Sequence, residues 1–169
     1  MSKPLEAFDK KLISILSGDG RLPVGKISQL LGVTNPTVRS RIRNLVDTGI
    51  LKIAGLVNPF RTKGLTLALV GINLSEHQRL DEKLNQIASL EKVSWAAVVT
   101  GRYDIFAEVV LDQDMDTLYD FITVELPRLG GIRSSESFMV MKAKGKWVLL
   151  PQGITSWGEN RTKGRGPDK

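Results

Sequence analysis

The chain has 169 residues, a net charge of +6 and no cysteine. The lack of cysteine excludes disulfide frameworks and thiolate metal sites, and the length allows one or two domains with a sizeable core. Residues 1–60 carry nine Lys and Arg against four Asp and Glu, residues 61–150 carry eleven against twelve, and residues 151–169 carry four against two. This distribution predicts a nucleic-acid footprint at the ends of the chain and a nearly neutral middle module.

The sequence contains no segment expected to enter a membrane. Its start lacks an apolar signal core, and its longest apolar run, Leu65 to Leu74, is too short to span a bilayer. We therefore expect a soluble cytoplasmic protein with no membrane partner.

Residues 1–53 are predicted to form a DNA-binding domain of three short helices. Apolar residues at helical spacing from Leu5 to Leu16 predict the first helix. Within Ile27 to Leu51, Gly32 can end a second helix, Asn35 can cap a third, and the following proline fits the first turn of that third helix. Two helices around such a tight turn predict a helix-turn-helix, which makes double-stranded DNA the expected partner.

The third helix is predicted to present a polar face to DNA. Its apolar residues recur at the spacing of one buried stripe, namely Val38, Ile42, Leu45 and Val46. Opposite them, Arg43, Ser40 and Asn44 suit base edges in a major groove, whereas Arg39 and Arg41 suit phosphates. An ordinary solvated helix face is the alternative interpretation. The complete predicted DNA-binding set is Thr34, Asn35, Pro36, Thr37, Arg39, Ser40, Arg41, Arg43 and Asn44.

The middle of the chain alternates between strand and helix patterns. Residues 54–64 are expected to connect the domains, and the β-branched run from Ile50 to Val57 predicts a connector strand or a small wing. Residues 65–150 then follow a βαββαβ order, with strands at Leu65–Leu74, Val93–Thr100, Ile105–Leu111 and Ile132–Met141 and helices at Glu76–Leu90 and Asp114–Leu126. This order predicts an α+β, ferredoxin-like domain with both helices on one face of an antiparallel sheet. The other face is expected to be covered, most simply by a second copy of the module.

Several short motifs follow one another in an order that carries a resemblance. They are Phe8–Ile13, Gly20-Arg21, Val38–Ile42, Gly49–Leu51 and Val99–Asp104. From about Leu5 to Met141 the chain resembles the Lrp/AsnC, or feast/famine, family of transcription factors. The resemblance implies a winged-type helix-turn-helix domain followed by a ligand-sensing RAM domain. It also implies a dimer built by swapping the connector strand and pairing the sheets, and further assembly into tetramers, octamers or hexadecamers.

The resemblance further implies that an amino acid or related small effector binds between dimers, near the turn at Gly101–Asp104. Gly101 supplies the positive φ that a short hairpin needs, and Asp104 can accept hydrogen bonds from turn amides, so turn chemistry alone also accounts for both residues. Polar serines of the last strand, including Ser137, are either ligand contacts or an exposed strand face. The predicted effector-binding set is Thr100, Gly101, Arg102, Tyr103, Asp104, Ser134 and Ser135.

Two alternative functions are those of a nucleoid-architectural protein that needs no ligand and of an enzyme resembling the sirohaem decarboxylases. Those enzymes carry histidines around the corresponding strands, whereas His77 is the sole histidine here and is expected at the surface. The acidic group at Asp112, Asp114, Asp116 and Asp120 lacks the glycine turn and terminal glutamate of a calcium loop. We expect no catalytic residues, no metal site and no cofactor. Residues 151–169 are predicted to form a flexible basic tail.

Overall fold

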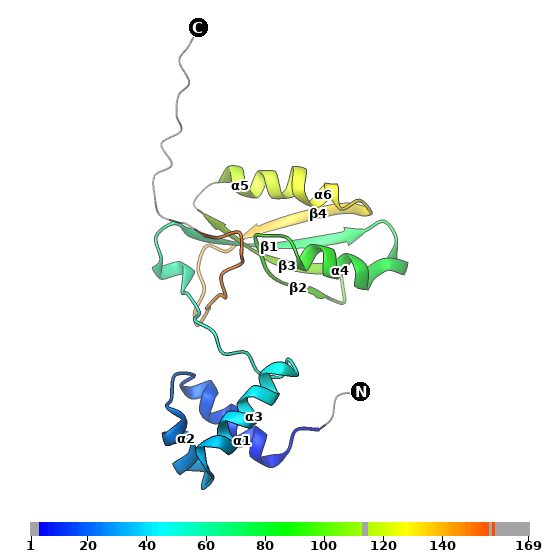
Figure 1. The fold of residues 1–169 in the computed structure, drawn as a ribbon. Coiled ribbons are helices and arrows are strands. Elements are labelled where there is room, and N and C mark those ends of the chain that lie inside the picture. The colour runs from blue at the N-terminus through cyan, green and yellow to red at the C-terminus, as the bar shows by residue number, and fades with distance from the viewer. Residues whose placement is uncertain (1–3, 113–114, 156, 158–169) are drawn as a thin grey trace. The chain divides into compact units, whose positions relative to one another are not determined.

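The computed structural model describes residues 4–112, 115–155 and 157. The chain divides into two compact units, residues 1–55 and residues 56–169 (Figure 1). Three helices form the first unit, and a four-stranded sheet with its helices forms the second. The predicted helix-turn-helix domain followed by an α+β domain is therefore confirmed.

The N-terminal unit consists of α1 (Ala7–Gly18), α2 (Val24–Leu31) and α3 (Asn35–Asp47) around a small apolar core (Figure 1). Each helix is too short to be stable alone, so its stability comes from the apolar face that it buries against the other two. The core side chains that are at most 6% exposed are Leu12, Leu16, Ile27, Val38 and Leu45.

The turn between α2 and α3 follows the sequence prediction at Gly32 and departs from it at the cap. Gly32 adopts the left-handed conformation, with φ of 67°, at the C-terminus of α2. The side chain of Thr34, and not that of Asn35, caps α3 by accepting a hydrogen bond from the Thr37 amide at 3.4 Å. Asn35 is the first residue of the helix. The predicted stripe is also narrower than expected, because Val46 is 44% exposed.

The connector does not form the predicted strand. In Ile50–Val57 the structure has one isolated antiparallel bridge, between Val57 and Val148. A strand requires a continuous ladder with a neighbour, and the apolar side chains that suggested one, Ile50, Ile53 and Leu56, are about half exposed. A 3-10 turn, η1 (Pro59–Arg61), follows before the sheet begins.

The C-terminal unit is built on one antiparallel sheet with the strand order β2-β3-β1-β4. Its strands are β1 (Leu65–Leu74), β2 (Val93–Val98), β3 (Ile105–Asp112) and β4 (Ile132–Met139). The 3-10 turn η2 (His77–Arg79) and α4 (Leu80–Ala88) connect β1 to β2. Between β3 and β4 lie α5 (Met115–Asp120), the π-helical η3 (Phe121–Glu125) and α6 (Leu126–Arg128). This is the predicted ferredoxin-like order.

The helices cover one face of this sheet. Alternate residues of β1 from Ala68 to Leu74 and of β3 from Ile105 to Leu111 point to this face, where they pack against Ile87 of α4 and Phe121 and Leu126 of the second helical segment. The period of two in both strands therefore decides which side chains form the main core.

The opposite face is partly covered by the chain's own C-terminal residues. Val148 and Ile154 pack against Leu65, Leu67 and Val110, and Ile154 is only 6% exposed. Part of the cover that we expected from a second copy is thus intramolecular. The tail predicted from residue 151 includes a buried side chain at Ile154, because that residue reaches this apolar face. Residues 156 and 158–169 of the predicted tail lie outside the described residues.

Candidate functional site

Eight of the nine predicted DNA-binding residues are exposed on α3 and the turn before it. Val38 and Leu45 hold the helix against the core, which leaves the opposite face open to solvent. This face extends over about three helical turns and combines guanidinium, hydroxyl and amide groups. The exposed residues are Thr34, Asn35, Pro36, Thr37, Arg39, Ser40, Arg43 and Asn44.

Arg41 differs from the other arginines of α3 because its side chain is engaged with α1. Its guanidinium lies 2.9 Å from a carboxylate oxygen of Glu6 and 3.5 Å from one of Asp9, and it also lies over the Phe8 ring. The Asp9 side chain is only 8% exposed, and its Oδ1 has no hydrogen-bond partner among the described residues. The predicted phosphate contact is therefore held in an intramolecular ion pair. Arg41 fixes α3 against α1.

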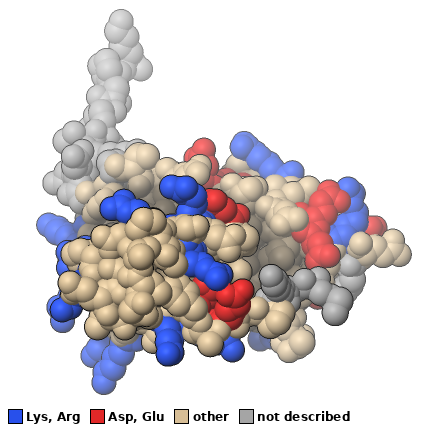
Figure 2. Space-filling model, turned by 60° about the horizontal axis from the view of Figure 1, so that its bottom comes forward, with Lys and Arg blue, Asp and Glu red and all other residues tan. Residues whose placement is uncertain are grey.

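The surface charge is consistent with a polyanionic partner. Lys and Arg side chains are more widespread than Asp and Glu side chains on the face that Figure 2 shows. Arg41 is paired with acidic residues, whereas Arg39 and Arg43 form no ion pair among the described residues. These two guanidinium groups are consequently available for phosphates or base edges.

The turn between β2 and β3 is held by backbone contacts of Asp104. Its Oδ2 accepts a hydrogen bond from the Leu74 amide at 2.8 Å, and its own amide donates to the Ile72 carbonyl at 3.0 Å. Gly101 has φ of 119°, a conformation that side chains disfavour. The Asp104 carboxylate thus binds the end of β1. Asp104 has a structural role in joining the turn to the sheet.

Tyr103 lies over Gly71 on the face of the sheet away from the helices. A Cβ added at Gly71 would come within 2.7 Å of the ring, so the tyrosine occupies the space of the missing side chain. The edge of the ring also meets Phe106 and Phe138, with centroid separations of 5.2 and 6.3 Å. This packing leaves Tyr103 only 8% exposed although it belongs to a hairpin turn.

A polar cluster surrounds the Tyr103 hydroxyl. The hydroxyl donates to the Glu136 carboxylate, which also pairs with Arg102 at 3.1 Å. The hydrogen bond to this carboxylate, together with burial, raises the pKa of Tyr103 above its ordinary value of 10.0. Beside the cluster, Asn73 donates to the Ser134 hydroxyl at 3.2 Å. Arg102, Tyr103 and Ser134 are therefore brought to one end of the sheet.

Ser135 is directed away from this cluster. It is paired with Ile72, whose side chain belongs to the core under the helices, whereas its neighbour Ser134 is paired with Asn73. Because successive residues of a strand point to opposite faces, Ser134 and Ser135 cannot line the same site within one copy of the chain. Thr100 is exposed in the turn.

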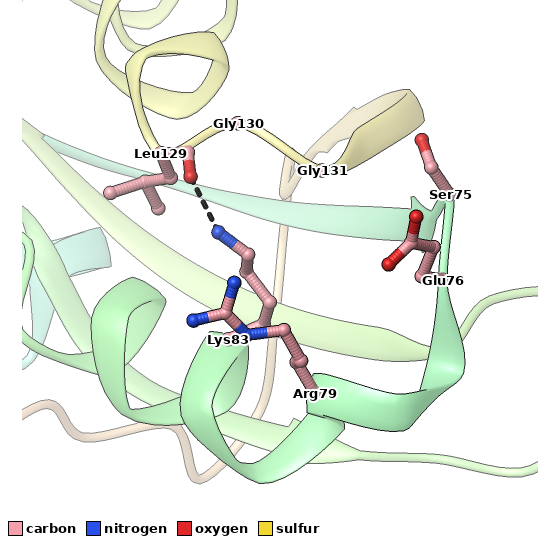
Figure 3. A pocket seen from close by; sticks show the side chains of 7 residues that line it. All are labelled: Ser75, Glu76, Arg79, Lys83, Leu129, Gly130 and Gly131. Atoms are coloured by element: carbon pink, nitrogen blue, oxygen red, sulfur yellow. Dashed lines mark hydrogen bonds between the residues drawn. The ribbon is translucent and has the colours of Figure 1, made fainter.

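Sequence reasoning missed a cavity of about 320 Å³ beside the start of α4. It is lined by Ser75, Glu76, Arg79, Lys83, Leu129, Gly130 and Gly131 (Figure 3). In the sequence the two glycines indicate only a break after the second predicted helix. One signal was present, since Lys83 lies three residues after Leu80 and four before Ile87, on the apolar side of α4.

Among the described residues, no three His, Cys, Asp or Glu side chains form a cluster suited to a metal ion. Within the same residues, no helix has the length and apolar character needed to cross a bilayer. The side chain of His77 and all of Asp114 lie outside the described residues.

Comparisons with known proteins agree with both units. The family described as the Lrp/AsnC ligand binding domain matches residues 67–146, and the winged helix-turn-helix DNA-binding family matches residues 5–52. An uncharacterized HTH-type transcriptional regulator of Pyrococcus abyssi is 32% identical over 144 residues, which are 85% of this chain and 89% of the relative.

Solved structures share the same fold. The structure of E. coli AsnC has a TM-score of 0.65 at 23% identity, and the match covers 83% of this chain and 95% of AsnC. A feast or famine regulatory protein from M. tuberculosis, complexed with L-methionine, has a TM-score of 0.68 at 21% identity, with 83% of this chain and 94% of that protein covered.

Proposed function

Because this chain belongs to the Lrp/AsnC family of DNA-binding transcriptional regulators, we propose that it recognises a specific operator through α3 and that a small metabolite changes its assembly or its affinity for DNA. The observation that carries the proposal is the polar face of α3, which follows a capped turn and on which Arg39 and Arg43 form no ion pair with any described residue. A helix of this kind fits the major groove, where sequence is read from base edges.

The residues of α3 divide into three roles in this proposal. Arg43, Ser40 and Asn44 contact base edges, because a guanidinium can donate two hydrogen bonds to guanine and an amide can pair with adenine. Arg39 contacts phosphate and fixes the register without reading sequence. Arg41 is a positioning residue that holds the angle of α3 through Glu6 and Asp9. The exposed residues from Thr34 to Thr37 complete the surface at the N-terminal end of the helix.

The effector is proposed to be an amino acid or a related metabolite. Two proteins that share this fold were crystallised with L-methionine, one from M. tuberculosis and one from Neisseria meningitidis. On this chain the cluster formed by Arg102, Tyr103 and Ser134 offers donors and acceptors at the end of the sheet. Gly101 and Thr100 expose turn backbone beside it, and Ser135 can join the site only from another copy of the chain.

In this proposal the chain assembles through the face of the sheet that lies away from the helices. Trp95 and Phe138 are each more than 40% exposed on the strands at the two edges of the sheet. Burying such aromatic side chains removes apolar area from water, which favours pairing of two sheets. We propose a homodimer that assembles further into tetramers, octamers or larger oligomers, with the effector bound between dimers.

The DNA part of the proposal is tested by comparing Arg43→Ala with Arg39→Ala. DNA protected upstream of the chain's own gene in footprinting supplies the specific site, and a scrambled duplex of equal length supplies the control. Arg43→Ala should cost roughly 1–3 kcal/mol on the specific site and little on the scrambled duplex, whereas Arg39→Ala should weaken both and lower the salt slope by about one. Equal losses on both duplexes for both variants would mean that the assigned roles are wrong.

The effector part is tested by adding each L-amino acid to the wild-type protein and measuring operator affinity and oligomer size. Coupling is reciprocal, so an amino acid that changes operator affinity must itself bind the DNA complex with affinity changed by the same factor. A chain that binds its operator but responds to no metabolite would instead act as an architectural DNA-binding protein.

A further inference from the structure

Lys83 is a buried cation that has no counter-ion in the part of the chain that the structure describes. The residue is only 9% exposed, yet its ammonium donates to two neutral groups. One is the Leu129 carbonyl (Figure 3), and the other is the side-chain oxygen of Gln86 at 2.8 Å. Among the described residues no carboxylate oxygen lies within 4.0 Å of its Nζ. Burial of a charge is costly unless an opposite charge or a metal compensates it. The site is thus electrostatically incomplete, and an ammonium has a third donor to offer.

Glu76 presents the opposite charge across the same cavity. Figure 3 shows its carboxylate on the wall formed by the end of β1, facing the side of the cavity from which Arg79 and Lys83 extend. Glu76 has no hydrogen-bond or ion-pair partner among the described residues. Arg79 uses Nε and Nη2 to bind Glu82 at 2.7 and 2.8 Å, so its remaining nitrogen is uncommitted. The cavity therefore has a cationic side and an anionic side. Each side has hydrogen-bonding groups that no described residue uses.

The third wall is backbone that approaches closely because it carries no side chains. Gly130 and Gly131 have φ of 63° and 66°, and a Cβ at Gly131 would lie 3.2 Å from Cε of Lys83. The carbonyl of Gly131 accepts the Ser75 amide at 2.9 Å, which fixes this loop against the end of β1. The volume of about 320 Å³ lies at the small end of roughly 300–1,000 Å³ for ligand sites.

We propose that this cavity binds a small zwitterion, namely a free α-amino acid, within a single copy of the chain. The carboxylate of the ligand supplies the missing counter-ion of Lys83 and meets the free nitrogen of Arg79. Its ammonium meets Glu76, and Ser75 provides a further polar contact. None of the residues that line this cavity belongs to the turn at Thr100–Asp104, so this is a second site, distinct from the one between dimers in the proposed function.

Binding to the full-length protein is measured by isothermal titration calorimetry with each of the twenty L-amino acids. The strongest ligand is then compared with its 2-hydroxy acid, which lacks the ammonium, and with its amine, which lacks the carboxylate. We expect both analogues to bind at least about tenfold more weakly, because each loses one charge-assisted contact. If the 2-hydroxy acid binds as tightly as the amino acid, the cavity recognises a simple anion and the proposed recognition of a zwitterion is wrong.

Glu76→Gln and Arg79→Ala locate the site. Both side chains are exposed, so both variants should keep the wild-type melting temperature. Their affinity for the amino acid should fall by at least about tenfold. Asp81→Asn and Arg128→Ala are matched controls, because they remove the same charges from exposed positions outside the cavity, and they should bind within twofold of wild type.

Wild-type affinity in both cavity variants would overturn this site while leaving the proposed regulation intact, since the effector would then bind elsewhere. Failure of all twenty amino acids to bind would also overturn it. A DNA response to another metabolite in that case would show that the proposed function survives without this site.

Discussion

Arg41→Ala should destabilise the N-terminal unit far more than an ordinary surface substitution does. Removal of one partner from a buried ion pair costs about 3–5 kcal/mol, because the other charge stays buried. The Arg41 side chain is 37% exposed, so water can enter after its removal and relieve part of this cost. Loss of the contact over Phe8 adds about 0.5 kcal/mol. We expect the free energy of unfolding to fall by about 2–3 kcal/mol, which corresponds to roughly 10 °C or more in a unit of this size.

The two units can be followed separately in one sample. All three tryptophans lie at or after residue 95, so their fluorescence reports on the C-terminal unit, whereas the helical circular dichroism signal includes α1 to α3. Arg41→Ala should lower the stability of a helical transition and leave the tryptophan transition in place. Adding Asp9→Asn should recover at least about 1 kcal/mol, because the uncompensated carboxylate is removed.

Arg39→Ala is the control, since its exposed side chain should leave stability unchanged but lower the salt slope of DNA binding by about one. If Arg41→Ala instead lowers the salt slope and leaves the melting temperature unchanged, then Arg41 binds phosphate and the positioning role is refuted.

Three further outcomes follow from the C-terminal unit. Asp104→Asn should lower the unfolding free energy by about 1–2 kcal/mol in urea denaturation, because it weakens the charged acceptor of a β1 amide; an unchanged midpoint would contradict the structural role. In a Tyr119→Phe background, Tyr103 should ionise above pH 10.0 in an ultraviolet titration, and Glu136→Gln should move the midpoint back toward that value. Because the folded-state pKa is raised, the stability from neutral Tyr103 is complete below pH 10.0 and is lost as pH rises through the folded-state pKa, so an alkaline gain in stability would refute the argument. Ile154→Ala should cost about 2–4 kcal/mol, whereas deletion of residues 156–169 should leave the melting temperature within a few degrees of wild type.

The fold was largely predictable because apolar periodicity reports directly on burial. The strand Leu65–Leu74 has the predicted bounds, and Gly32 ends α2 as expected. The connector from Ile50 to Val57 forms no strand within one copy of the chain, because β-branched composition says nothing about whether the same copy offers a partner strand. Capping by Thr34 in place of Asn35 is a shift of one residue, which the shared capping preference of both residue types cannot resolve.

The sequence predicts the candidate site only where the apolar stripe of a helix determines which of its other residues are exposed. The polar face of α3 is of this kind, since Val38 and Leu45 determine which residues point outward. The engagement of Arg41 depends on Asp9, thirty-two positions away, and no local pattern distinguishes it from its neighbours. The cavity at Lys83 likewise joins two loops that are far apart in sequence.

The contact between Gly71 and Tyr103 couples these two positions, so substitutions at them should occur together. A methyl group at position 71 would overlap the ring, and a smaller residue at position 103 would leave a hole over the glycine. We therefore expect each substitution to be tolerated only when the other is present. A scan of single substitutions should score both positions as intolerant. A library that varies the two positions together should recover folded chains. Members of the family that carry a side chain at position 71 should accordingly lack an aromatic residue at 103, even though one position lies within a central strand and the other in a hairpin turn.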